Sequence, residues 1–566
     1  MAMRFQWLKW ACASVLLAGC YEGIQDGAGA SGLSGGGLDD GGSSDGSEDT
    51  DGDDGGMVPG DYEPAPVSLR RLLASQYVES IRLLLGDAAA AVANPPDDAA
   101  LNGFTAIGAS QLALGSAEVD RYETSARDIA AAAVAEGTVV GAYVTCTPTA
   151  PTDDACMRTF IGNFGRFAFR HTLEPDELSR YTNVALTAAG DQQDFYAGVE
   201  AGIAAMLQSP LFLYQVETGE PDPDTPSQRR LVGTELATRV SFFLTGATPD
   251  VTMLDAAENG FLDEPGGVRA AAEALLERNE ARIALRGFSD ELLRLRDLDG
   301  LPKDAATFPT YDTELAAAMR EETRRLIEHV AFDLDGDFSE VFDANYTFVN
   351  DVLAAHYGIP GEFGSEFVQV TLPAEQRRGG ILGHAGMLSV LAHVSSTSPT
   401  LRGKYIRETL MCQTIPAPPP GVVTDLPVGD GTETMRERLQ IHMTDPSCSG
   451  CHLLMDPIGF ALESYDGVGA YRTLDNGKPI DDSADLDGVP VAGALELGAA
   501  LRDSNAAHAC LIRNLYRHAT GHVETESELD ALASVSDAYA ASGHNLKAAL
   551  IEIAASPAFR VVGEPL

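Results

Sequence analysis

The sequence predicts a mainly α-helical protein of several domains, with one short β element and a distinctive C-terminal segment. Its 566 residues suffice for roughly three or four domains of ordinary size. Apolar residues recur at helical spacing over long blocks, whereas runs typical of strands are few. With 45% hydrophobic residues, the chain has ample material for buried cores and is typical of a folded protein.

Residues 1–19 are typical of an export signal. Arg4 and Lys9 give a positive start, and the apolar stretch Trp10 to Ala18 is too short to remain as a membrane span. The sequence Leu-Ala-Gly-Cys that ends at Cys20 is typical of a bacterial lipobox, in which Cys20 becomes the lipidated first residue. The alternative is an ordinary cleaved signal with an incidental cysteine. We expect an exported protein that is anchored to a membrane of the bacterial envelope, at its periplasmic or outer face.

Residues 20–63 form an acidic tether rich in Gly, Ser and Asp. Between residues 21 and 63 there are twelve acids and no Lys or Arg, so this segment cannot bury enough apolar surface to fold. Asp45 to Asp54 does not match a calcium loop, because a Gly at position six and a closing Glu are missing. We therefore predict a solvated spacer.

The charge of the whole chain excludes one class of partner. Asp and Glu number 84 against 38 Lys and Arg, for a formal net charge of −46. Only five lysines occur, and none lies in a basic cluster. Nucleic-acid backbones are bound by clustered Lys and Arg, so we expect no nucleic-acid partner.

The exported body divides into helical modules. Leu69 to Leu85 carries apolar residues at helical spacing, and Gly86 is typical of a helix end. Pro175 is typical of a first helical turn, and Ser209-Pro210 breaks the next block. The predicted helical modules are 64–135, 136–208 and 209–332, followed by a fourth module at 333–435, the C-x-x-C-H segment at 436–479 and a C-terminal helical module at 480–566.

The fourth module differs from the helical ones. Phe367 to Leu372 alternates as a strand does, and it is the best β-like run in the chain. Pro416 to Pro420 favours an extended polyproline conformation. We predict a short β element and a stiff connector that leads into the C-terminal part.

One motif points more specifically than any other to a kind of site, and it is Cys448-Ser449-Gly450-Cys451-His452. C-x-x-C-H is the spacing of covalent haem c attachment, with thioethers to both cysteines and His452 as the proximal ligand of the iron. A zinc site would need a second ligand pair, which is not found at a convincing spacing. A redox disulfide normally lies in a βαβ context, which this part of the sequence does not predict. Haem is the favoured interpretation, and the other two stay as alternatives.

The other cysteines are consistent with this assignment. Cys12 leaves with the signal, so four remain besides the lipidation and haem candidates. An even number in an oxidising compartment suggests two disulfides. Of three pairings, we favour Cys146–Cys156 as a local bridge and Cys412–Cys510 as a tie between the connector and the C-terminal helices.

The distal ligand of the iron is not decided by the sequence. Met455 lies only three residues after His452, on the proximal side. Without a distal ligand, the iron would be five-coordinate and open to small molecules, which separates an electron carrier from an enzyme. The candidates for the distal position are His442, Met443 and Met435 upstream and His508, His518 and His522 downstream.

The stretch from Cys448 to Arg472 resembles a family pattern, C-x-x-C-H-x-x-x-D-P-x-G-F-x-x-E-x-x-D-x-x-G-x-x-R. The pattern is that of large secreted, cytochrome-c-like bacterial proteins of planctomycete and myxobacterial type. These are built from the domains of unknown function 1587, 1595, 1592, 1588 and 1585. Motifs similar to each domain follow in this order: Arg70 to Gly86; Phe167 to Arg170; Ser209 to Tyr214 with Arg239 to Leu244; Arg378 to Leu382 with Ser398 to Gly403; and Leu515 to His522 with Ser556 to Arg560.

Asp456, Glu463, Asp466 and Arg472 suggest acid–base catalysis, but no substrate position supports it. We expect Asp456 to Gly459 to form a turn, and the acids to hold a loop at the haem edge. The favoured function is a lipid-anchored haem c protein that transfers one electron, with a redox partner protein. The acidic surface could steer a basic partner or serve solubility alone. The alternatives are a haem enzyme with an open distal site, of oxidase or peroxidase type, and a haem-free envelope scaffold or polymer-binding protein.

Overall fold

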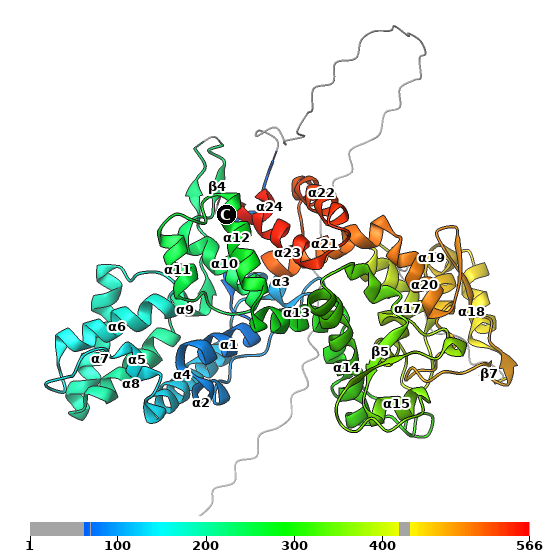
Figure 1. The fold of residues 1–566 in the computed structure, drawn as a ribbon, viewed down its shortest axis with the longest axis horizontal. Helices are drawn as coiled ribbons and strands as arrows, with labels where there is room; N and C mark the ends of the chain where they lie inside the picture. The colour runs from blue at the N-terminus through cyan, green and yellow to red at the C-terminus, as the bar shows by residue number, and fades with distance from the viewer. Residues whose placement is uncertain (1–61, 68, 224, 418–430, 565–566) are drawn as a thin grey trace, which may run out of the picture. The chain divides into compact units, whose positions relative to one another are not determined.

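The computed structural model describes residues 62–67, 69–223, 225–417 and 431–564 (Figure 1). The prediction of a mainly helical protein is confirmed, since α-helices α1 to α24 dominate these residues and the strands are short. Cys20, the signal, residues 20–61 of the tether and the prolines after Ala417 lie outside the described residues. Among the residues that are described, no helix is long and apolar enough to cross a membrane.

The N-terminal part of the described chain builds a core of its own. Apolar residues between Leu72 and Phe242 form this core, in which the rings of Phe160 and Phe164 stack on each other. Cys146 and Cys156 form the local disulfide that the sequence predicts. The elements are β1 (Arg70–Arg71), α1 (Ala74–Leu85), α2 (Asp87–Ala91), α3 (Thr105–Gln111), α4 (Ser116–Glu136), α5 (Val140–Tyr143), α6 (Asp154–Ala168), α7 (Pro175–Gln192), α8 (Phe195–Leu207), α9 (Pro210–Leu213) and β2 (Tyr214–Gln215).

Local signals place several of these boundaries as expected. Gly86 follows α1 with a φ of 89°, and Pro175 is the first residue of α7. Ser209 caps the short helix α9 with its side chain. The helix expected from Leu69 begins only at Ala74, because Arg70 and Arg71 pair with β2 instead. Tertiary pairing therefore overrides the helical spacing at this point.

The central part joins the larger core. It contains the predicted β element, because Val368–Thr371 pairs antiparallel with Tyr346–Val349. The elements are β3 (Glu220–Pro221), β4 (Gln228–Arg230), α10 (Gly233–Thr245), α11 (Val251–Glu258), α12 (Pro265–Leu276), α13 (Asn279–Leu292), α14 (Thr313–Glu328), β5 (Tyr346–Val349), α15 (Asp351–Tyr357), β6 (Val368–Thr371), α16 (Ala385–Val390) and α17 (Pro399–Tyr405), with π-helical turns at His329–Leu334 and Ile406–Leu410.

The C-terminal part packs on the central part and reaches the beginning of the described chain, where Gly563 forms a β-bridge with Pro66. Strand β11 pairs with β4, and α23 packs against α12. The larger core contains residues from Tyr62 to Val562, so segments far apart in sequence share it. The elements are α18 (Met435–Thr444), α19 (Ser449–Phe460), β7 (Leu474–Asp475), β8 (Lys478–Pro479), β9 (Ser483–Leu486), β10 (Val489–Ala492), α20 (Gly493–Arg502), α21 (Asn505–Thr520), α22 (Glu526–Ala541), α23 (Leu546–Ala555), α24 (Pro557–Arg560) and β11 (Val561–Gly563).

The second predicted disulfide is also present. Cys412 follows the π-helical turn that extends α17, and it is bonded to Cys510 in α21. The bridge spans 98 residues of sequence, and it closes a loop that contains the whole C-x-x-C-H segment. The bridge therefore limits how far the two sides of this loop can separate.

Candidate functional site

The C-x-x-C-H motif forms the N-terminal turn of α19. The backbone N–H groups of Cys451 and His452 both donate to the carbonyl of Cys448, at 3.2 and 3.1 Å. Asp445 prepares this turn, because its carbonyl accepts from Cys448 and Ser449. The first helical turn thus brings both thiols and the imidazole together. Both thiols are free and half-exposed.

His452 is oriented by a buried carboxylate on the same helix. Its Nδ1 lies 2.8 Å from Oδ2 of Asp456, one helical turn further on. The other oxygen of Asp456 accepts a hydrogen bond of 2.7 Å from the hydroxyl of Thr400 in α17. Burial raises the pKa of Asp456, while the hydrogen bonds from Thr400 and His452 oppose that rise. The pairing assigns a proton to Nδ1, which leaves Nε2 with a lone pair for a metal.

The expectation that Asp456 to Gly459 forms a turn is wrong. Helix α19 continues through Pro457 to Phe460. Proline has no N–H to donate, so it costs the helix one hydrogen bond, but it is tolerated here inside a short helix that is tightly packed on α17. The continuation matters for the site, because it puts Asp456 on the same helical face as His452.

Helices α18 and α19 enclose a small apolar cluster that is separate from the two large cores. It consists of Met435, Leu439 and Phe460, with Met443 packed against it. His442 projects from α18 toward α19, and its ring centroid lies 4.6 Å from that of His452. Burial lowers the pKa of His442, and the neighbouring His452 lowers it further. Its Nδ1 is buried and has no hydrogen-bond partner within the described residues.

Of the proposed distal ligands, only those on α18 lie beside this site. His518 pairs with Glu291 at 3.1 Å and packs against the rings of Phe104 and Phe288. His508 packs against His544 and Tyr539. Their side chains are thus engaged within the larger core of the molecule rather than at His452.

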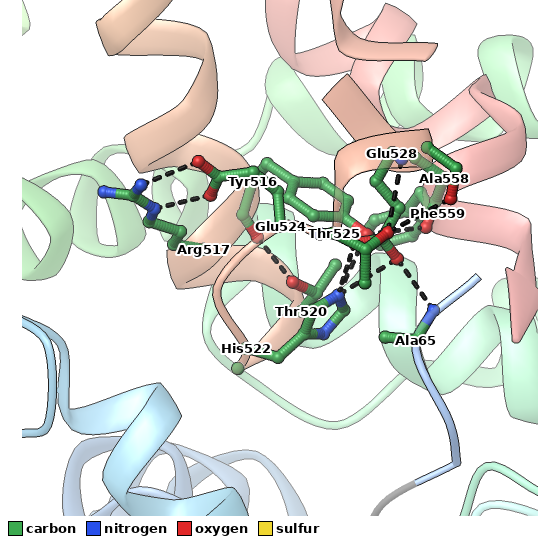
Figure 2. Close-up of polar contacts among 12 residues, drawn as sticks. Ala65, Tyr516, Arg517, Thr520, His522, Glu524, Thr525, Glu528, Ala558 and Phe559 are labelled. Atoms are coloured by element: carbon green, nitrogen blue, oxygen red, sulfur yellow. Dashed lines mark hydrogen bonds and ion pairs between the residues drawn. The ribbon is translucent and has the colours of Figure 1, made fainter. Parts of the chain in front are cut away.

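His522 belongs to a polar network at the N-terminus of α22 (Figure 2). Its Nε2 lies 3.1 Å from both carboxylate oxygens of Glu528 and 3.2 Å from the hydroxyl of Tyr516. The backbone N–H groups of Ala65 and Thr525 also donate to Glu528. This network ties the start of the described chain to the C-terminal module.

The remaining acids hold the loop after α19. Glu463 is buried and accepts hydrogen bonds from Thr397, Arg402 and Arg472. One carboxylate oxygen of Asp466 accepts from the backbone of Val468 and Ala470. These contacts are those of a structural network.

Thr400 and two glycines complete the site, and nothing in the sequence singles out Thr400 as a partner of Asp456. A Cβ on Gly403 of α17 would collide with the carbonyl of Met455, and one on Gly459 would collide with the carbonyl of Pro399. The two helices therefore cross in close contact. The glycines in both helices are the only signal for this contact that the sequence contains.

The residues offer two thiols and one imidazole nitrogen on one turn, beside an apolar cluster. In the part of the chain that the structure describes, no three His, Cys, Asp or Glu side chains gather in a way that would hold a metal ion. That finding concerns sites built from several protein ligands, whereas a haem iron takes one or two.

Five family models match the chain, each described as a protein of unknown function. They are DUF1587 at residues 70–135, DUF1595 at 156–217, DUF1592 at 231–359, DUF1588 at 378–475 and DUF1585 at 487–559. The motif Ser209 to Tyr214 falls within the second match, not the third as expected, and the C-x-x-C-H segment falls within the fourth. Neither a curated protein nor a solved structure matches. The chain belongs to the proteins that carry this five-domain series, in this order.

Proposed function

We propose that this chain is a haem c protein of the bacterial envelope that transfers single electrons. The observation that carries the proposal is the state of the described cysteines. Four of the six are paired in two disulfides, and the two that stay free are Cys448 and Cys451. In an oxidising compartment, two thiols on one helical turn that are not bonded to each other call for another covalent partner.

The residues around the thiols fit the group. Cys448 and Cys451 would form the two thioether bonds, and His452 would ligate the iron through Nε2 while Asp456 fixes its ring plane. The apolar cluster of Met435, Leu439 and Phe460 would cover part of the macrocycle. When bound, haem c supplies an iron that changes between the ferrous and ferric states.

The test is a search for the haem peptide. The full chain is expressed for export in a bacterium with a complete c-type maturation system, separated on a denaturing gel, stained for covalent haem and digested for mass spectrometry. We expect haem on the peptide that contains Cys448 and Cys451. Haem-free peptide from cells that mature a control cytochrome c would contradict the proposal and would favour the scaffold alternative.

One observation favours the haem enzyme as a second candidate. The rings of His442 and His452 lie too close for a planar macrocycle to fit between them. The other histidines proposed as distal ligands have partners elsewhere. If neither Met435 nor Met443 of α18 takes the distal position, that position would be open. A high-spin spectrum that changes with carbon monoxide would favour the enzyme, and a low-spin spectrum that does not change would favour the electron carrier.

The proposed location is a membrane of the cell envelope, with Cys20 as the lipidated residue. The support is the lipobox in the sequence and the acidic spacer that follows it. Metabolic labelling with a fatty acid should mark the wild-type protein and not Cys20→Ser. Labelling of both proteins would contradict the assignment of Cys20. The net charge of −46 would suit a basic redox partner, whose association should then weaken as salt is added.

A further inference from the structure

Packing alone does not explain why the side chain of Asp456 is buried at this site. The side chain is fully buried, although burying a carboxylate costs free energy. Both of its oxygens are used, one by Nδ1 of His452 and one by the hydroxyl of Thr400. Thr400 is a neutral donor, so the carboxylate directs its charge mainly at His452.

The frame around Asp456 is tightly packed. Gly403 and Gly459 let α17 and α19 approach until backbone meets backbone. Arg407 donates from Nε to the carbonyl of Leu454 at 3.1 Å, which adds a polar contact from the extension of α17 to α19. Asp456 is consequently positioned by two helices, with its Oδ2 2.8 Å from Nδ1 of His452.

An anionic acceptor at Nδ1 differs in effect from the neutral carbonyl that often occupies this place. It increases the electron density of the imidazole and makes Nε2 the stronger donor to a metal. Stronger donation favours the more highly charged metal ion, so it stabilises the ferric state over the ferrous state.

We propose that Asp456 is a positioning residue that sets the reduction potential of the iron through His452. The inference rests on the proposed haem function. It applies equally to the carrier and to the enzyme, because both depend on the relative stability of the two iron states. Thr400 also influences the potential, since its hydroxyl withdraws electron density from the same carboxylate.

The test is spectroelectrochemical titration of the matured, haem-loaded full chain. Asp456→Asn keeps the shape but removes the charge, so we expect the reduction potential to rise. The matched control is Asp445→Asn, which removes the same charge from an exposed residue close to the motif in sequence. We expect a smaller shift in the control than in Asp456→Asn.

Thr400→Val is the second variant, in case Asp456→Asn does not fold. It leaves the carboxylate with His452 as its remaining hydrogen-bond donor, so the potential should move in the opposite direction, downward. An unchanged potential in Asp456→Asn, equal shifts in Asp456→Asn and its control, or no downward shift in Thr400→Val would overturn the inference alone. A wild-type chain without haem would overturn the proposed function, and this inference with it.

Discussion

Two histidine–carboxylate pairs in this molecule use the same chemistry in opposite ways. In the first, His522 meets Glu528, which also accepts from two backbone N–H groups (Figure 2). In the second, His452 meets Asp456, whose side chain accepts one other hydrogen bond from the described residues, that of Thr400. Glu528 is saturated with donors and Asp456 is not. The difference indicates that the first pair holds chain segments together. The second pair orients an imidazole whose Nε2 is left available to a metal.

The pKa values of the two carboxylates agree with this contrast. Burial raises the pKa of both side chains. At Glu528 the hydrogen bond and charge of His522, together with the backbone donors, outweigh burial and lower the pKa to about 2. At Asp456 the donors are too few, and the pKa stays above its ordinary value.

The largest expected effect is the difference in haem content between the variants His452→Ala and His522→Ala. His452→Ala should abolish stable haem incorporation, because the proximal ligand is lost. His522→Ala should leave haem staining intact and lower stability instead. Both are measured on the same preparations, by haem stain per unit of protein and by urea unfolding. Loss of haem in His522→Ala with unchanged stability would contradict the contrast.

The next effect concerns Glu528. Glu528→Gln should destabilise the body by about 3 kcal/mol, because a buried carboxylate loses its charge while the groups that donate to it remain. Glu526→Gln, an exposed position on the same first turn of α22, should change stability by less than about 0.5 kcal/mol. Urea unfolding midpoints compare the two. Equal effects of the two substitutions would show that the network in Figure 2 adds no more to stability than an exposed side chain does.

The carboxylate of Glu528 should also make the free energy of unfolding depend on pH in the acid range. Its pKa is lowered in the folded state, so its contribution is present above the ordinary value of 4.5 and is lost as the pH falls toward 2. A difference of this size corresponds to about 3 kcal/mol. The free energy of unfolding of the wild type should fall through this pH window, and that of Glu528→Gln should fall less. Parallel curves would contradict the assignment.

The smallest effect concerns the crossing of α17 and α19. Gly459→Ala would drive a methyl group into the carbonyl of Pro399, and overpacking of this kind costs about 1–3 kcal/mol. Gly450→Ala, on the same helix with open space around it, should be neutral or stabilising by up to about 1 kcal/mol. Thermal unfolding distinguishes them. An unaffected Gly459→Ala would mean that the close approach is not required.

Local chemistry was enough to predict much of this fold. Gly86 ends α1, Pro175 begins α7, and the alternating run around Val370 is a strand, because each depends on the backbone preferences of a few neighbouring residues. The two disulfides followed from the parity of the cysteines and from their place in the chain.

Contacts across long stretches of sequence could not be predicted in this way. Arg70 and Arg71 leave the expected helix because they find a partner strand more than 140 residues away. Thr400 meets Asp456 only because two helices cross at glycines. Pro457 suggests a turn, yet packing on α17 keeps it helical. The motif residues and Asp456 were visible in sequence, but the contact by which Asp456 orients His452 required the structure.

The absorption spectrum of the purified full chain, matured outside the cytoplasm, tests the central claim most directly. We expect a Soret band and a c-type pyridine haemochrome from a haem that resists acid–acetone extraction, and the loss of both when Cys448 and Cys451 are replaced by Ala. A colourless wild-type protein from cells that mature a control cytochrome c would contradict it, as would covalent haem that persists in the double variant.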